Sequence, residues 1–222
     1  MTSKFKAHQV YKIKEGKRVP GATTVINLYG DNKGALMGWM RKECLAGRDP
    51  YKVRDKEADI GTVAHALVEE HVHKALGDDN FKALERLEYS PLTMEVAEKA
   101  FNAFLHWEEN ANIEYMAAEM QLASEEFRYG GTIDIVAKLD GELTIIDLKT
   151  SKAVYDDHKI QIGAYRNLYT ENFGEVPKAF ILQLSKKDGL PYPHPISDQI
   201  ADHAFEMFKH LVGLYYLRDH IK

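Results

Sequence analysis

The 222-residue sequence has very little cysteine and no long apolar run. Its single cysteine, Cys44, can form no internal disulfide and cannot supply a four-cysteine zinc or iron–sulfur site. We therefore expect a reducing, cytoplasmic setting. No apolar run approaches the roughly 18 residues of a membrane-spanning helix. Residues 1–14 are basic and mixed, without the apolar middle segment of a secretory signal, so neither a membrane nor an exported protein is predicted.

An excess of basic residues is also absent. The sequence has 29 Lys and Arg against 34 Asp and Glu, for a formal net charge of −5. Proteins that coat nucleic acid non-specifically are usually basic, so that class is disfavoured. A local basic groove around an acidic centre is still compatible with this charge. Acidic centres are what metal-dependent phosphodiester hydrolysis uses.

Residues 1–222 contain no repeat, low-complexity tract or flexible linker, which favours a single domain. We expect a mostly helical part (1–118), a sheet with a helix (119–186) and a closing helix (187–222). The predicted elements are brief strands at 10–13 and 23–28, helices at 33–46, 60–76 and 94–116, strands at 121–127, 132–139 and 142–148, a helix at 155–169, a strand at 179–184 and a helix at 198–217. This order predicts an α/β fold in which helices flank a small mixed central sheet.

Asp140-Gly141 lies between two apolar runs and signals a two-residue β-hairpin loop. The type I′ turn of such a loop needs positive φ at both central residues, which Asp-Gly tolerates. A loop of this length brings Asp134 directly opposite Asp147, with their Cβ atoms roughly 5 Å apart. A bulge would destroy this register. The sequence therefore predicts two facing aspartates.

Two like charges at facing positions repel each other, so either one carboxyl group is protonated or a cation lies between them. Lys149 is two residues after Asp147 and therefore on the same face of the strand. Such an Asp–Asp–Lys cluster is often a solvated salt-bridge surface. Here, however, Asp147 stands within the apolar run 145–148, which is typical of a buried strand, and buried charges need partners. Paired carboxylates suit Mg²⁺ or Mn²⁺, and such an ion polarises phosphate and activates water.

Four segments in this order resemble the PD-(D/E)XK nuclease superfamily, and specifically its RecB-like branch. They are Gly61-Thr62-Val63-Ala64-His65, Gly131-Thr132-Ile133-Asp134, Ile145-Ile146-Asp147-Leu148-Lys149-Thr150-Ser151 and Gln161-x-x-x-Tyr165. Residues 20–25 and 35–39 are similar to segments of phage-type and mitochondrial single-chain exonucleases of this branch. The resemblance implies a restriction-endonuclease-like core with a helical N-terminal portion. The single cysteine excludes the iron–sulfur members of the branch.

The resemblance implies a metal-binding role for two acids. Asp134 and Asp147 would bind Mg²⁺ or Mn²⁺, with the backbone carbonyl of Leu148 as a further ligand. His65 would be an additional ligand from the preceding helix. On an amphipathic helix, the alternative for this residue is a half-buried packing histidine.

The resemblance also implies roles for residues around the metal. Lys149 would be the catalytic lysine, orienting water or stabilising developing negative charge. Gln161 and Tyr165 are one helical turn apart and would contact the DNA backbone or brace the site, although simple packing is the alternative. Glu119 would support the water shell of the metal.

The resemblance implies a metal-dependent deoxyribonuclease, in particular an exonuclease that acts on DNA ends in recombination or repair. Because the chain is short and has no attached helicase or targeting segment, we expect a bacterial or phage-infected cell. The rival is a non-catalytic nucleic-acid-binding or interaction module that retains the nuclease fold. Six basic residues either form a phosphate-tracking patch or lie on a solvated surface; they are Lys152, Lys159, Arg166, Lys178, Lys186 and Lys187. The sequence leaves open the polarity of digestion, the preference for single or double strands, and the choice between DNA and RNA. It also leaves open whether the chain forms a homo-oligomer or binds a recombination partner protein.

Overall fold

The computed structural model describes residues 9–30 and 33–221. Most of the basic N-terminal segment, for which the sequence predicts no export signal, lies outside the described residues. Among the described helices, none has the length and apolarity needed to cross a bilayer.

A five-stranded mixed sheet lies at the centre of the fold, in the order β3-β4-β5-β6-β7. β5 and β6 run parallel, while the other neighbours are antiparallel. The strands are β3 (Ile113–Ala123), β4 (Gly130–Leu139), β5 (Glu142–Lys149), β6 (Lys178–Leu184) and β7 (Pro191–Ile196). This sheet confirms the predicted α/β architecture.

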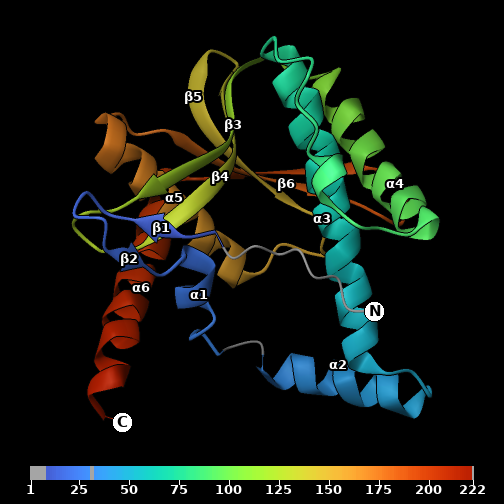
Figure 1. Cartoon of the computed structure of the whole chain (residues 1–222), viewed down its shortest axis with the longest axis horizontal. Helices are drawn as coiled ribbons and strands as arrows, with labels where there is room; N and C mark the ends of the chain where they lie inside the picture. The colour runs from blue at the N-terminus through green and yellow to red at the C-terminus, as the bar shows by residue number, and fades with distance from the viewer. Residues whose placement is uncertain (1–8, 31–32, 222) are drawn as a thin grey trace.

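Helices cover both faces of the sheet (Figure 1). α3 (Pro50–Ala75) and α4 (Pro91–Glu108) pack against one face, while α1 (Ala22–Ile26), α5 (Asp156–Phe173) and α6 (Asp198–Leu217) pack against the other. Alternation along the strands separates two buried apolar clusters, because successive side chains point to opposite faces. Ile135 and Ile146 join the α3–α4 cluster, whereas Val136 and Ile145 join the α5–α6 cluster.

Three shorter or peripheral elements complete the helical set. α2 (Lys33–Leu45) lies at the foot of α3, away from the sheet (Figure 1). Two short 3₁₀ helices follow, η1 (Leu84–Arg86) between α3 and α4, and η2 (Arg218–Ile221) after α6. The helix predicted at 33–46 and the one predicted at 198–217 are therefore confirmed.

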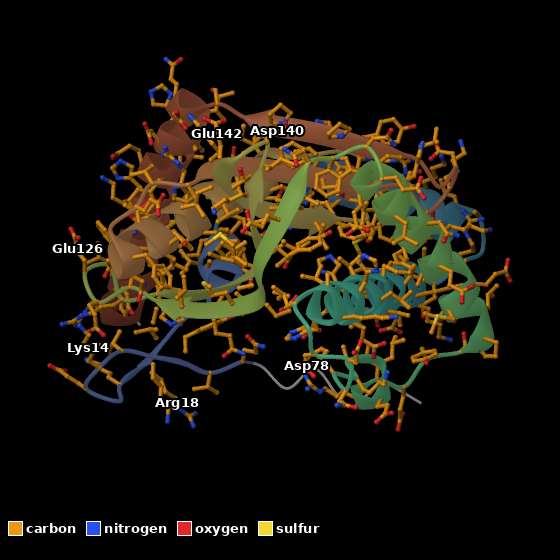
Figure 2. The ribbon with its side chains drawn as sticks, turned by 90° about the horizontal axis from the view of Figure 1, so that it is seen from above. Lys14, Arg18, Asp78, Glu126, Asp140 and Glu142 are labelled. Atoms are coloured by element: carbon orange, nitrogen blue, oxygen red, sulfur yellow. The ribbon has the colours of Figure 1, made fainter. Side chains whose placement is uncertain are left out.

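The β4–β5 hairpin has the predicted loop. Asp140 and Gly141 adopt φ values of 53° and 82°, as a type I′ turn requires. Figure 2 shows Asp140 and Glu142 at the tip of this hairpin. The predicted register is confirmed from Leu139 opposite Glu142 to Ile135 opposite Ile146. The regular pairing then stops one residue short of Asp134 and Asp147. Contrary to the prediction, these aspartates are therefore not a paired position of the β4–β5 ladder.

The N-terminal segment differs from the prediction. The strand predicted at 23–28 is wrong, because residues 22–26 form α1 and bury Ala22, Val25 and Ile26 at helical spacing. The remaining N-terminal strands are β1 (Tyr11–Lys12) and β2 (Arg18–Val19), which pair as a small hairpin on which Figure 2 places Lys14 and Arg18. The segment is joined to the sheet where Gly130 N–H donates to the Pro20 carbonyl at 2.9 Å.

Two further helix boundaries are corrected. α3 begins at Pro50 rather than at Ile60, because the Asp49 side chain caps it by accepting from the N–H groups of residues 51 and 52. The helix predicted at 94–116 ends at Glu108, and its last part belongs to β3. The sheet therefore begins before residue 119 and, through β7, extends beyond residue 186.

Candidate active site

The site lies where β4 and β5 separate. Just beyond the last paired residues, Oδ2 of Asp134 accepts a hydrogen bond of 2.7 Å from the backbone N–H of Leu148. The side chain of Asp134 is 13% exposed and that of Asp147 is 1% exposed. The negative charge of Asp134 adds to the burial that raises the pKa of Asp147, so the two acids act on each other electrostatically.

Asp147 is a buried carboxylate with incomplete compensation. Nζ of Lys149 lies 2.5 Å from its Oδ2. Among the residues that the structure describes, no donor makes a hydrogen bond of regular geometry to either oxygen. Burial raises the pKa of Asp147 despite the nearby ammonium group. A buried carboxylate in this state is suited to accept an additional positive charge.

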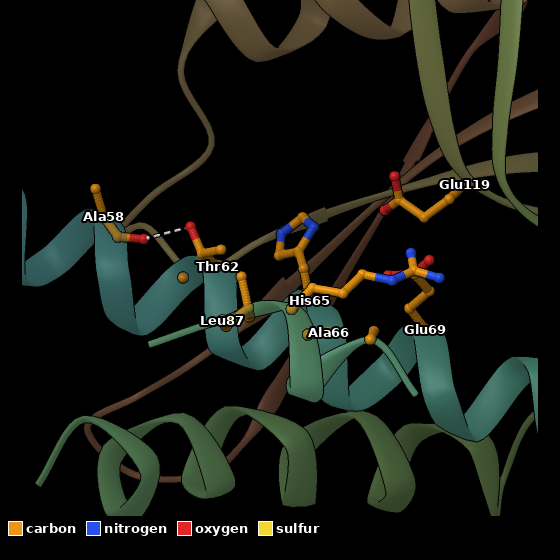
Figure 3. Close-up of a pocket in the computed structure, with 10 residues that line it drawn as sticks. Ala58, Thr62, His65, Ala66, Glu69, Leu87 and Glu119 are labelled. Carbon is orange, nitrogen blue, oxygen red and sulfur yellow. Dashed lines mark hydrogen bonds between the residues drawn. The ribbon is translucent and has the colours of Figure 1, made fainter. Parts of the chain in front are cut away.

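A second acid and a histidine adjoin Asp134. His65 of α3, Glu119 of β3 and Asp134 each offer one ligand atom, and these atoms lie within 4.8 Å of one another. Nδ1 of His65 is 3.8 Å from Oδ2 of Asp134. Figure 3 shows His65 rising from α3 towards the Glu119 carboxylate. One imidazole nitrogen and two carboxylates at this spacing fit a divalent cation.

Glu119 owes its position to an irregular backbone. Its φ is 48°, a conformation that few non-glycine residues adopt and that is often found at functional sites. The β3–β4 pairing includes Ala118 with Ile135 and Met120 with Ile133, and omits the intervening Glu119. Burial and then the charge of Asp134 raise the pKa of Glu119 to about 9. Without a cation nearby, this carboxyl group is therefore protonated at neutral pH.

Lys149 is held in a chain of hydrogen bonds that ends on α5. Its Nζ donates to Oε1 of Gln161 at 3.1 Å, and Nε2 of Gln161 donates to the hydroxyl of Tyr165 at 2.7 Å. Burial raises the pKa of Tyr165 well above its usual value, so the phenol stays protonated. The structure thus brings together the residues that the sequence placed one helical turn apart. Sequence reasoning missed His158, whose pKa is lowered by burial and by the charge of Lys149.

The site opens into a hollow of about 450 Å³ beside α3. Gly61, Thr62 and His65 of α3 line it together with Glu119 (Figure 3). Two charged residues of this hollow were missed by the sequence analysis, Glu69 and Arg86. Glu69 has a detectable signal, since it follows His65 by one helical turn. Arg86 has none, because it comes from η1.

For the six basic residues, the alternatives are a phosphate-tracking patch and a solvated surface, and the structure divides these residues between different surroundings. Lys152, Lys186 and Lys187 line a second hollow with Thr150 and Ser151, which follow Lys149 directly. Lys186 is ion-paired with Glu57 of the same hollow. The remaining three basic residues also pair with acids. Lys159 pairs with Asp156, Lys178 with Asp198, and Arg166 with Asp198 and Asp202.

A mixed central sheet flanked by helices thus carries the two aspartates and the lysine. A family model of the PD-(D/E)XK nuclease superfamily matches residues 38–216. The chain belongs to this superfamily, whose members use divalent metal ions, and the restriction-endonuclease-like fold predicted by resemblance is confirmed.

Two solved structures are similar to the chain at low identity. One is a crystal structure of a protein from Eubacterium rectale that is provisionally named an exonuclease. Its TM-score is 0.44 and its sequence identity is 18%. The match covers 67% of this chain and 63% of the Eubacterium rectale chain. The other is the crystal structure of SSO0001, with a TM-score of 0.30 and 16% identity. This match covers 70% of this chain and 74% of the SSO0001 chain. A search of curated proteins finds no match.

Proposed function

We propose that this chain is a divalent-metal-dependent DNA nuclease, and in particular an exonuclease, formed as one domain by residues 1–222. The observation that carries the proposal is the convergence of His65, Glu119 and Asp134 beside the Asp147–Lys149 ion pair. Three carboxyl groups lie around one ammonium group, and in their ionised forms they leave an excess of negative charge. A divalent cation offsets that excess.

The proposed metal ligands come from three elements. His65, Glu119 and Asp134 would hold the ion, with Asp147 and the carbonyl of Leu148 as the further ligands that the family resemblance implies. When bound, Mg²⁺ or Mn²⁺ polarises the phosphate and makes water a stronger nucleophile. Glu119 then joins the ligand set as a carboxylate, because a cation favours its ionised form.

Lys149 supplies positive charge from the protein itself. Its Nζ is held between Asp147 and Gln161, and its side chain is 15% exposed, so it can reach a phosphate oxygen or a water molecule in the site. In this position it would stabilise the charge that develops on the phosphate. Gln161 and Tyr165 would act as positioning residues, since they hold the ammonium group rather than the reacting atoms.

The DNA-end specificity and the role in recombination or repair rest on the resemblance to single-chain exonucleases. Lys152 and Lys187 line a hollow beside the site and support a phosphate-backbone path there, while Lys186 of the same hollow is ion-paired with Glu57. Nucleic acid contacted in this way is bound with little sequence preference.

Linear and circular DNA of the same sequence, with a matched RNA, test this proposal in Mg²⁺, Mn²⁺ or EDTA. Metal-dependent loss of linear DNA alone supports the exonuclease, and loss of both DNA forms supports an endonuclease instead. If neither is lost with any metal while DNA is still bound, the chain is a non-catalytic binding module. Asp147→Asn is the matched control for contaminating nucleases, because it changes one buried group.

A further inference from the structure

We propose that Arg86 binds a phosphate group of the DNA on the α3 side of the active-site hollow. This inference rests on the proposed nuclease function and adds a substrate-binding residue to it. Arg86 ends η1, in the connection between α3 and α4, and none of the motifs in the sequence includes it. It lines the same hollow as His65 and Glu119.

The charge distribution of the hollow leaves one place for a phosphate. Glu69 and Glu119 line it, and Asp134 lies beside His65 at its inner end. In their ionised forms, these acids repel a DNA strand. Of the described residues that line the hollow, Arg86 is the single lysine or arginine. A phosphate that enters from this side is therefore attracted at Arg86 before it meets the metal ligands.

The backbone around Arg86 is anchored to α3 before any substrate arrives. The ring of Phe81 stacks on His73 with centroids 3.7 Å apart, and the guanidinium of Arg86 lies 4.9 Å from the Phe81 ring centroid. Oε1 of Glu70 accepts a hydrogen bond of 2.9 Å from the N–H of Leu84. A side chain presented by an ordered segment loses less conformational entropy when it binds a ligand.

The guanidinium itself is available for a ligand. Among the described residues, no carboxylate lies at ion-pair distance from Arg86. Burial raises the pKa of Glu69, and the charge of Arg86 only partly opposes this. The guanidinium carbon lies over the Phe81 ring, and such a cation–π contact does not use the N–H donors for a hydrogen bond. Two parallel N–H donors match the oxygens of a phosphate, which a lysine ammonium cannot reproduce.

The competing explanation is that Arg86 only compensates the charge of Glu69. The two explanations differ in the Glu69→Gln background, where no carboxylate is left to compensate. If Arg86 binds phosphate, Arg86→Ala still weakens DNA binding in that background. If Arg86 only balances Glu69, the second substitution has no further effect.

The test measures binding of a fluorescent DNA oligonucleotide to the uncleaving Asp147→Asn protein at several salt concentrations. Arg86→Ala is expected to raise the Kd by roughly tenfold and to reduce the slope of log Kd against log salt by about 1. Arg86→Lys should restore the slope and only part of the affinity. Lys82→Ala is the matched control, because it removes the same charge from an exposed position of the same segment outside the hollow.

Equal Kd values and salt slopes for Arg86→Ala and Lys82→Ala would overturn the inference. Thermal unfolding of each variant separates a lost contact from a disordered segment, and the Lys variant repeats the test if the Ala variant unfolds. Cleavage by the wild-type chain is measured in parallel. A wild-type chain without metal-dependent cleavage contradicts the proposed function, while the salt slope still decides whether Arg86 binds phosphate.

Discussion

The Asp134 carboxylate accepts a hydrogen bond from the backbone N–H of Leu148, with 2.7 Å between Oδ2 and N. Leu148 lies between Asp147 and Lys149, so this single bond connects one acid to the strand that carries the other acid and the lysine. A backbone donor cannot rotate away as a side chain can. The relative placement of the three charged groups is therefore set by the separation of β4 and β5 rather than by side-chain choice.

Loss of either buried charge of β5 should stop cleavage without unfolding the protein. We expect Asp147→Asn or Lys149→Ala to lower kcat by at least about 100-fold, because each removes a charge beside the reacting phosphate. Asp147→Asn loses its attraction to Lys149 but also removes a desolvated carboxylate and its repulsion with Asp134, so the variant should remain folded. Cleavage assays and chemical denaturation measure the two effects. Unchanged cleavage in either variant would refute the assigned roles.

Gln161 should act on turnover rather than on substrate binding. Gln161→Ala removes the acceptor that holds Nζ of Lys149, so we expect kcat to fall by about tenfold with a smaller change in KM. Tyr165→Phe keeps the ring and loses the bond to Gln161, so its effect should be smaller. Steady-state kinetics of both variants test this order. An increase in KM alone would instead make Gln161 a substrate-binding residue.

Gly131 should be essential for packing beneath the site. A Cβ atom added there would lie 2.6 Å from Cε1 of Tyr165 and 2.9 Å from Cδ1 of Leu168. We expect Gly131→Ala to destabilise the protein by about 1–3 kcal/mol and to lower activity through displacement of Tyr165. Gly34→Ala is the control, since its Cβ meets nothing within 4 Å and alanine favours the helix there. Urea denaturation that shows equal stability for both variants would contradict the close approach.

Stability at acidic pH should depend on Glu108 of α4. Nε2 of His71 lies 2.9 and 2.8 Å from its two carboxylate oxygens, and the hydroxyl of Tyr115 donates to it. Burial alone would raise the pKa of Glu108, but these hydrogen bonds and the charge of His71 outweigh it and hold the pKa below the ordinary 4.5. The stability that comes from this lowered pKa is therefore present above pH 4.5 and is lost as the pH falls through the folded-state pKa.

The comparison with Glu108→Gln isolates this contribution. We expect the difference in unfolding free energy between wild type and variant to be constant from about pH 6 to 5 and to shrink below the unfolded-state pKa of about 4.3. Denaturation of both proteins across this range measures it. Glu98→Gln, at an exposed position of the same helix, should show no such trend. A difference that grows as the pH falls would have the wrong sign for this network.

Local patterns sufficed for much of the fold. Asp140-Gly141 specified the hairpin register, because few residue pairs tolerate two positive φ values in succession. The boundaries of α6 follow from Ser197, whose side chain caps the helix, and from its apolar spacing. These are effects of neighbouring residues, which a sequence displays directly.

Features that depend on distant contacts were missed. β7 carries Pro191, Pro193 and Pro195, which argue against a strand, yet an edge strand tolerates proline where its N–H side faces away from the neighbour. Glu119 is predicted as a site residue by resemblance, but its positive φ is not suggested by its residue type. Arg86 lines the hollow because its segment is anchored to α3, where Glu70 accepts a hydrogen bond from the N–H of Leu84, and no local pattern predicts that contact.

Diffraction from a crystal soaked in Mn²⁺, with anomalous data, tests the central claim most directly. The account predicts an ion bound by His65, Glu119 and Asp134, near the buried oxygens of Asp147, and loss of that ion in Asp134→Asn crystals. An ion bound elsewhere, or a soaked site in which these groups stay apart and metal-free, would contradict it.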